Sequence, residues 1–167
     1  MNSQMETLRV NLESAVAGMS NEQLTGKWCA SEVLEHLYLT YRNDQRFRAS
    51  HHNGQAARHE NVHGASRADL HGGGLGYLPA GRKSPAVAEP RGLPTEQVRN
   101  EIGAKLVAMD ALLAQCESRF GRRVKLLDHP ILGPLTAPQW RTLHLVHGRH
   151  HQKQLLRLRE MAPQPPP

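Results

Sequence analysis

The chain has little of three things that mark whole classes of protein. It contains two cysteines, Cys29 and Cys116, and no Cys-x-x-Cys pair, which excludes a disulfide framework and a cysteine zinc knuckle. Aromatic residues make up only 4%, and no window approaches ~20 consecutive apolar residues, so no transmembrane helix is expected. The first residues lack the basic start and apolar run of a secretory signal. We therefore expect a reduced, cytoplasmic protein.

What the chain does have is enough length and apolar content for one domain. It has 167 residues, of which 38% are hydrophobic. The 21 Lys and Arg residues exceed the 15 Asp and Glu residues and give a formal net charge of +6. That balance suits an acidic partner such as nucleic acid but does not identify one. Eleven residues are histidine, and their positions carry most of the functional argument.

Four segments show apolar residues at steps of three and four, the spacing of amphipathic helices. They cover residues 4–19, 29–50, 95–119 and 137–161. No alternating strand pattern and no internal repeat is present. The sequence therefore predicts an all-α protein, a four-helix bundle.

Two of the predicted helices have recognisable start signals. Thr95 is expected to be the N-cap of the third helix. For the fourth helix, Thr136 and Gln139 form a Thr-x-x-Gln capping box. Leu135 and Trp140 occupy the positions of a hydrophobic staple on either side of that cap.

Residues 51–94 interrupt the helical pattern. This stretch contains eight of the fourteen glycines, four prolines and five histidines, and it has no sustained period. We expect a long irregular insertion between the second and third helices, either functional or, as the composition favours, flexible. Residues 1–161 then form a single helical domain, and the proline-rich residues 162–167 form an extended tail.

Two histidines of the fourth helix have the spacing that binds one metal ion. His147 and His151 stand four residues apart and share the helix face of Trp140 and Leu158, which should point into the bundle. The glutamate of the zinc-protease His-Glu-x-x-His helix is absent here. His36, on an otherwise apolar face of the second helix, is the best candidate for a third ligand. Three imidazoles would leave one coordination position open, as in catalytic metal sites.

Each candidate residue also has a purely structural interpretation. A histidine on an apolar helix face is most often a core residue, and His-x-x-x-His pairs arise by chance in a histidine-rich chain. Glu32, one turn before His36, and Gln154, on the face of His147, are candidate catalytic residues that would orient a ligand or handle a proton from behind the site. For Glu32 the alternative is an ordinary surface glutamate. The series Arg149, Lys153, Arg157 is expected to be a solvated helix face.

Two sequence motifs resemble those of the DinB/YfiT-like superfamily. Lys27–Leu37 reads Lys-Trp-Cys-Ala-Ser-Glu-Val-Leu-Glu-His-Leu and resembles the Trp-Ser-x-x-Glu-x-x-x-His-Leu opening of the superfamily's second helix. His129–Thr136, followed by Trp140, His147–His151 and Gln154, resembles its last-helix signature. The resemblance covers residues 1–50 and 95–161.

The resemblance implies a fold and a metal site. Members of the superfamily are four-helix bundles that bind a divalent metal ion, usually zinc or nickel, through three histidines. Matched position by position, these histidines are His36, His147 and His151. Cys29 stands where the family usually has a serine that caps the helix, so a different cap is expected here.

The resemblance also implies chemistry at the metal ion. Characterised relatives transfer or isomerise with low-molecular-weight thiols such as bacillithiol, mycothiol or glutathione, and others are described as metal-dependent hydrolases. The leading hypothesis is therefore a thiol S-transferase that acts on a small electrophilic substrate. A metal-dependent hydrolase is the alternative within the same class.

Two other classes of function, and a dimer, are also considered. A basic nucleic-acid-binding module is disfavoured, because the chain has no helix-turn-helix spacing and no aromatic stacking platform. A non-catalytic bundle would use the metal only to stabilise the fold. Family members are commonly dimers, and Leu145 and Leu156 fall on the outer side of the fourth helix, so a homodimer is expected.

Overall fold

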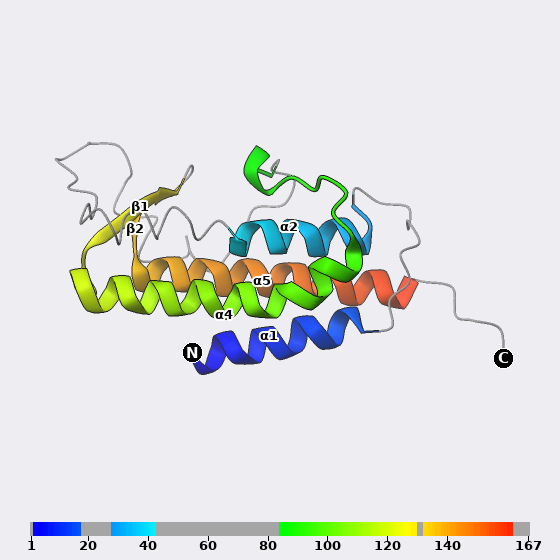
Figure 1. The fold of residues 1–167 in the computed structure, drawn as a ribbon, viewed down its shortest axis with the longest axis horizontal. Coiled ribbons are helices and arrows are strands. Elements are labelled where there is room, and N and C mark those ends of the chain that lie inside the picture. Colours follow the sequence, from blue (N-terminus) through cyan, green and yellow to red (C-terminus); the bar gives the residue numbers. More distant parts are fainter. Residues whose placement is uncertain (1, 18–27, 43–83, 130–131, 162–167) are drawn as a thin grey trace.

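The protein is a bundle of helices with one short hairpin (Figure 1). The computed structural model describes residues 2–17, 28–42, 84–129 and 132–161. Within these ranges the α-helices are α1 (Ser3–Val16), α2 (Ala30–Arg42), α4 (Thr95–Phe120) and α5 (Ala137–Met161). A 3-10 turn, η1 (Ala86–Ala88), precedes α4, and strands β1 (Lys125–His129) and β2 (Gly133–Thr136) lie between α4 and α5. The prediction of an all-α bundle is confirmed.

All four predicted helices are present, although α1 already ends at Val16, where Ala17 is its C-cap, and α2 begins at Ala30, one residue later than predicted. Helices α4 and α5 end within one residue of their predicted limits, and α1 begins one residue earlier than predicted. Residues 18–19, 43–50 and 51–83 of the predicted helices and insertion lie outside the described residues. Residues 84–94, the described part of the insertion, are irregular apart from η1.

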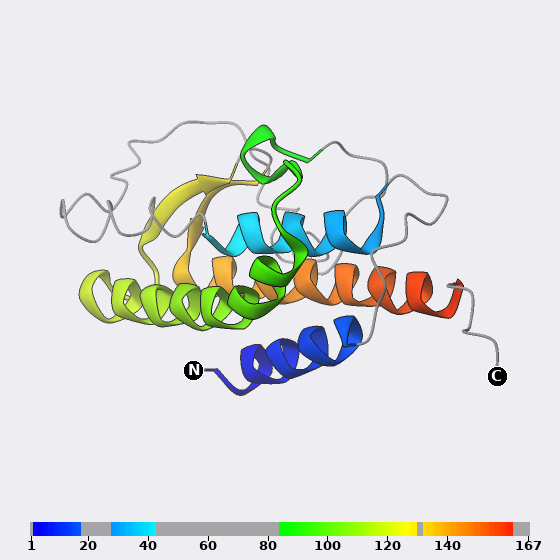
Figure 2. The ribbon, with the colours of Figure 1, turned by 45° about the vertical axis from the view of Figure 1, so that its right-hand side comes forward.

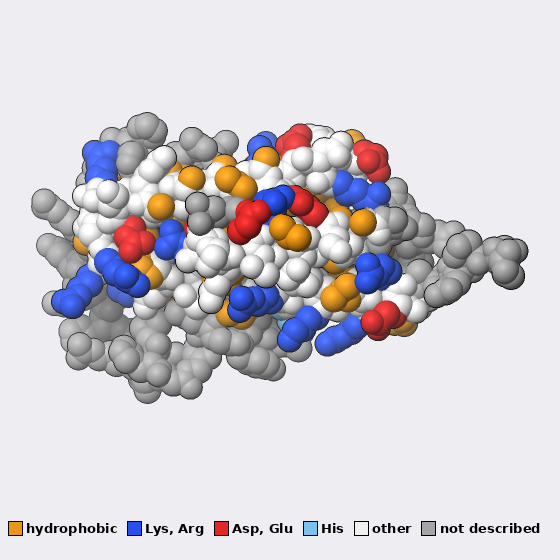
Figure 3. All heavy atoms as spheres, turned by 90° about the horizontal axis from the view of Figure 1, so that it is seen from below, with side chains coloured by type: hydrophobic (Ala, Val, Ile, Leu, Met, Phe, Trp, Pro, Cys, Tyr) orange, Lys and Arg blue, Asp and Glu red, His pale blue; other side chains and the backbone are white. Residues whose placement is uncertain are grey.

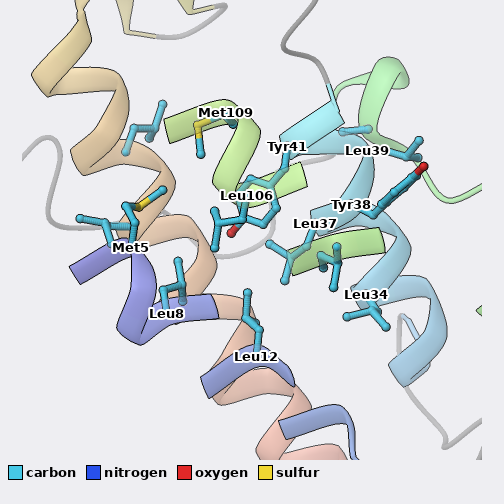
Figure 4. Close-up of a cluster of buried hydrophobic side chains, with 14 of the residues drawn as sticks. Met5, Leu8, Leu12, Leu34, Leu37, Tyr38, Leu39, Tyr41, Leu106 and Met109 are labelled. Carbon is cyan, nitrogen blue, oxygen red and sulfur yellow. The ribbon is translucent and has the colours of Figure 1, made fainter. Parts of the chain in front are cut away.

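Helices α4 and α5 form the centre of the bundle. They run side by side in opposite directions, with α2 on one side of the pair and α1 on the other (Figures 1 and 2). Each helix buries its apolar stripe in a common core. Figure 4 shows part of that core, to which α1 contributes Leu8 and Leu12, α2 Leu37 and α4 Leu106. The apolar spacing in the sequence is therefore the spacing of core positions.

Gly148 allows three helices to come together beside the predicted metal ligands. A Cβ atom at Gly148 would lie 2.5 Å from Leu8 Cδ2 of α1 and 2.5 Å from the Tyr41 hydroxyl oxygen of α2. Both of those side chains are fully buried and appear in Figure 4. Because any larger side chain would push α1 or α2 away from α5, this position needs glycine for close approach.

The start of α5 has the predicted capping box. The Gln139 backbone N–H donates to Thr136 Oγ1 at 3.3 Å, and the Thr136 N–H donates to Gln139 Oε1 at 2.9 Å. Lys125 Nζ of β1 also donates to that Gln139 oxygen, at 2.9 Å. Leu135 and Trp140, the predicted staple residues, are both buried. The hairpin and the first turn of α5 are thus joined through one amide side chain.

Two features differ from the sequence predictions. Thr95 is the first residue of α4 rather than its N-cap, which is Pro94 and provides no side-chain hydrogen bond. The β1–β2 hairpin is not predicted, because its strands have five and four residues and each buries a single leucine, Leu126 and Leu135. One buried position per strand is too short a pattern to show an alternation.

A buried carboxylate ties the N-terminus to the two central helices. Asp110 of α4 is only 2% exposed. Its Oδ1 pairs with Arg141 Nε of α5 at 2.6 Å, and its Oδ2 accepts the backbone N–H of Asn2 at 2.9 Å. Asp110 therefore has both oxygens satisfied, as a buried charge requires.

The two leucines from which a homodimer is expected, Leu145 and Leu156, do not form an exposed apolar stripe on α5. Leu145 is only 6% exposed, and Leu156 is partly buried against the core. The reason is that α5 has α1, α2 and α4 packed around it, so it buries more than one face. None of the helices in the described ranges is long and apolar enough to cross a membrane.

Candidate metal centre

Three histidine side chains from two helices meet at one point between α2 and α5. His147 Nε2 lies 3.0 Å from His36 Nε2 and 3.1 Å from His151 Nε2. The potential ligand atoms of the three residues all lie within 4.8 Å of one another. His36 and His151 are buried, and His147 is partly buried. The structure thus brings together the three histidines that spacing and resemblance had singled out.

Helix geometry explains the α5 part of this cluster. One helical turn separates His147 from His151, so the two imidazoles project from the same face. Burial of Trp140 and Leu158 on that face turns both rings towards α2. His36 projects from the buried side of α2, and its ring centroid lies 5.0 Å from that of His147 and 4.8 Å from that of His151.

The tautomers of two histidines are fixed by hydrogen bonds on the far side of each ring. His36 Nδ1 lies 2.8 Å from the carbonyl oxygen of Ala88, and a carbonyl only accepts, so Nδ1 carries the hydrogen. His151 Nδ1 is likewise 3.0 Å from Gln154 Oε1. In a neutral imidazole this leaves Nε2 with a free lone pair, the arrangement found in metal-binding histidines.

The donor atoms fit a divalent transition-metal ion. Two nitrogens bound tetrahedrally to zinc at about 2.0–2.1 Å lie roughly 3.3–3.4 Å apart. The observed separations of 3.0 and 3.1 Å are close to that value. Imidazole suits zinc, copper, iron and nickel. The three histidines could therefore hold such an ion, which would be bound by nitrogen alone.

Burial keeps these histidines in the form that binds metal. Burial lowers the pKa of His36, and it lowers that of His151 to about 4, helped by repulsion from His36. The pKa of His147 falls well below its usual value because of burial and the neighbouring histidines. Among the described residues no Asp, Glu or Cys joins the cluster. The imidazoles are therefore neutral at pH 7, as metal ligation requires.

Two aromatic side chains flank the site. The ring centroid of Trp28, a half-buried residue just before α2, lies 4.9 Å from that of His36 and 6.4 Å from that of His151. His150 is exposed, and its ring lies edge-on to His151 at 5.0 Å. Trp28 thus forms a wall beside the ligands, and His150 marks the solvent edge of α5.

The two candidate catalytic residues behind the site are placed differently. Gln154 contacts His151 directly, as described above. Glu32 Oε2 instead accepts the backbone N–H of Cys29 at 2.8 Å, so it caps the start of α2. The Cys29 thiol is buried and lies 3.0 Å from Ser31 Oγ. A catalytic role for Glu32 remains a prediction.

Several residues near the site are missed by sequence reasoning. Ala88 acts through a main-chain carbonyl, which has no signature in sequence. Ser84, whose Oγ lies 3.2 Å from His36 Nδ1, falls in the irregular insertion. Glu35 is 3% exposed, and a glutamate within the apolar run before His36 is the one signal that could have revealed it.

A second buried polar pair lies outside the cluster. His144 is 5% exposed and Tyr41 is fully buried, and their rings lie 5.9 Å apart. Within the described ranges, neither ring nitrogen of His144 nor the Tyr41 hydroxyl has a hydrogen-bond partner. Burial lowers the pKa of His144 to about 4 and raises that of Tyr41. His144 is therefore a neutral core histidine that the structure does not bring to the site.

The basic residues of α5 lie on the opposite side, as predicted. Arg149, Lys153 and Arg157 are exposed. On the face shown in Figure 3, Lys and Arg side chains form separate groups with Asp and Glu side chains between some of them. That face does not present the continuous positive surface typical of nucleic-acid binding.

Comparison with known proteins gives one partial match. The model of a family described as "Protein of unknown function (DUF1569)" matches residues 84–158. The matched range includes Ala88, His147, His151 and Gln154 and stops short of α2, which carries His36. No curated protein and no solved structure matches the chain.

Proposed function

We propose that the protein is a metal-dependent enzyme of the DinB/YfiT-like type, formed by one domain over residues 1–161. His36, His147 and His151 would bind a zinc or nickel ion. The observation that carries the proposal is the convergence of one ring nitrogen from each of three histidines within 4.8 Å, with the Nδ1 atoms of His36 and His151 hydrogen-bonded on the far side. Three ligands leave room for substrate, which is typical of catalytic rather than structural sites.

Within this class we propose a transferase that uses a low-molecular-weight thiol and a small electrophilic substrate. A divalent ion held by the histidines would lower the pKa of a coordinated thiol or water and polarise an electrophile. Hydrolysis usually also needs a general base beside the water. Among the described residues no carboxylate joins the histidines, and the Glu32 carboxylate is bonded to the Cys29 N–H. A base for hydrolysis would therefore have to come from outside the described residues, and the resemblance to thiol-using proteins favours the thiol reaction over the alternative, a metal-dependent hydrolase.

The surrounding side chains have defined roles in this proposal. Gln154 orients His151 by accepting its Nδ1–H, and the main-chain carbonyl of Ala88 does the same for His36. Trp28 offers an apolar surface beside the ligands, against which a substrate could pack. None of these side chains supplies or removes a proton.

The test begins with metal analysis of the purified protein, which should contain about one zinc or nickel ion per chain. Thermal-shift measurements with bacillithiol, mycothiol, glutathione and coenzyme A should then identify a thiol that stabilises the metal-loaded protein only. The stabilising thiol should be conjugated to an electrophilic fluorogenic probe. Ester hydrolysis without thiol consumption would support the hydrolase instead.

The remaining alternatives are tested in the same series. Stabilisation by metal with no effect of any thiol or substrate would identify a non-catalytic bundle. Salt-sensitive binding of a fluorescent DNA would identify a nucleic-acid-binding module. We also propose a cytoplasmic homodimer on the basis of the family resemblance, and light scattering that gives the monomer mass at high protein concentration would refute the dimer.

A further inference from the structure

Glu35 has the most fully bonded carboxylate next to the site, yet it is not part of the histidine cluster. Its side chain is 3% exposed. Oε1 accepts the N–H of Arg91 at 2.6 Å, and Oε2 accepts those of Gly92 and Leu93 at 3.0 and 3.1 Å. Three successive backbone N–H groups thus converge on one carboxylate, an arrangement that binds an anion strongly.

The same stretch of chain also contacts His36. Residues 84–93, called here the 84–93 segment, run above α2 before α4 begins (Figure 1). The segment gives the Ala88 carbonyl to His36 Nδ1 at 2.8 Å and Ser84 Oγ to the same nitrogen at 3.2 Å. Two adjacent residues of α2, Glu35 and His36, therefore bind two points of one segment that are three residues apart.

The backbone of the segment is shaped for this contact. Gly92 has φ +80°, a left-handed conformation that favours glycine. It lies between the other two donors to Glu35, where it lets three consecutive N–H groups point the same way. Nothing lies within 4 Å of a Cβ built at Gly92, so the glycine is needed for its conformation and not for space.

We propose that Glu35 is a positioning residue for the metal ligand His36. Its carboxylate fixes the 84–93 segment at residues 91–93, so that the Ala88 carbonyl stays on His36 Nδ1 and the free lone pair stays on Nε2. This inference rests on the proposed function for its effect on metal binding, but its effect on the His36 tautomer holds for the metal-free protein as well.

The physical consequence of losing Glu35 is specific. Without the carboxylate the segment has three unsatisfied N–H groups and moves from α2, and His36 Nδ1 loses its acceptor. A neutral imidazole with no fixed partner populates both tautomers. The tautomer with hydrogen on Nε2 cannot bind metal through that atom, so metal affinity falls.

The test is Glu35→Gln, which keeps the shape of the side chain and removes its charge. In metal-free wild type, proton–nitrogen NMR of the His36 ring should show the hydrogen on Nδ1, and in the variant the hydrogen on Nε2 should be populated. Zinc affinity, measured by competition with a chelator, should fall by about 10- to 100-fold. Circular dichroism confirms that the variant is folded.

Asp110→Asn is the matched control. Asp110 is also a buried carboxylate that accepts a backbone N–H, but it ties α4 to α5 and Asn2 away from the site. This variant should lower the Tm and leave the His36 tautomer and the zinc Kd of the folded protein unchanged. An equal change in Asp110→Asn would show that Glu35 acts only through global stability and would overturn the proposal.

Gly92→Ala keeps the inference testable if Glu35→Gln does not fold. It strains the backbone of the 84–93 segment itself. It should therefore also populate the His36 tautomer with hydrogen on Nε2 and weaken zinc binding. Wild-type tautomer and Kd in the folded variants would overturn the proposal. Failure of the wild-type protein to bind either zinc or nickel would refute the proposed function alone, because the NMR comparison still decides the role of Glu35.

Discussion

The two halves of the candidate metal centre are built in different ways. On α5, His147, His151 and Gln154 lie within eight residues of one helix, so their arrangement follows from helix periodicity alone. On α2, His36 depends on the Ala88 carbonyl, which is 52 residues away in sequence. The α5 half is present whenever that helix forms, whereas the α2 half exists only when the tertiary structure is complete. Among changes that keep all three histidines, those that separate α2 from α5 should therefore lower metal affinity most.

Removal of the α5 half should have the largest effect. His147→Ala combined with His151→Ala should abolish stoichiometric zinc or nickel binding, because one imidazole cannot retain a transition-metal ion at micromolar concentration. Each single change, and His36→Ala, should also reduce bound metal strongly. His71→Ala, at a position outside the described residues, is the control and should keep full occupancy. Metal analysis after gel filtration measures this, and stoichiometric metal in the double variant would refute the site.

Gly148→Ala should weaken the packing of α5 against α2 and α1 and lower the free energy of unfolding. The new methyl group would lie 2.5 Å from the Tyr41 hydroxyl of α2 and from Leu8 of α1, and such overpacking costs about 1–3 kcal/mol of unfolding free energy. Urea denaturation of the metal-free protein measures the loss. Gly103→Ala is the control, since its closest neighbour is the end of the flexible Glu13 side chain. Equal destabilisation by both changes would contradict the argument.

Acid should destabilise the metal-free protein. Part of this effect should come from His144, which lies outside the histidine cluster. The pKa of His144 is about 4 when folded, below its usual value near 6.5, so the unfolded chain binds more protons. Above pH 6.5 His144 is neutral in both states, and the free energy of unfolding has its full value. As the pH falls from 6.5 towards 4, the unfolding free energy decreases by up to about 1.4 kcal/mol per pH unit. His144→Leu should flatten this dependence in urea titrations between pH 4.5 and 7. An unchanged slope would show that other histidines account for it.

Gln154→Ala should have the smallest effect on metal binding. It tests whether the α5 half of the site is organised by its helix. Loss of the amide removes the acceptor from His151 Nδ1 and should raise the zinc Kd by about tenfold. The helix still aims His151 at the site, so the change should be smaller than that of Glu35→Gln. A larger effect of Gln154→Ala would mean that the α5 half is not organised by its helix alone.

Local signals explain what the sequence predicts correctly. The start of α5 follows from the Thr136–Gln139 capping box, and the His147–His151 pair follows from a four-residue spacing. Signals that depend on distant contacts are missed. The Ala88 carbonyl leaves no trace in sequence. The sequence pattern predicts Leu145 on the outer side of α5 because it assumes one buried face, whereas α5 is surrounded by three helices and Leu145 is buried.

The link between the hairpin and Gln139 fixes the rotation of α5 about its own axis. One amide oxygen accepts from Lys125 of β1 and from the Thr136 N–H, so the helix starts at a fixed angle relative to β1. Each residue of an α-helix advances that angle by about 100°. A single-residue deletion between Gln139 and His147 would therefore turn both imidazoles about a quarter of a circle away from His36 while the helix itself remained intact. The number of residues between Gln139 and His147 therefore determines the direction in which the imidazoles point relative to the hairpin.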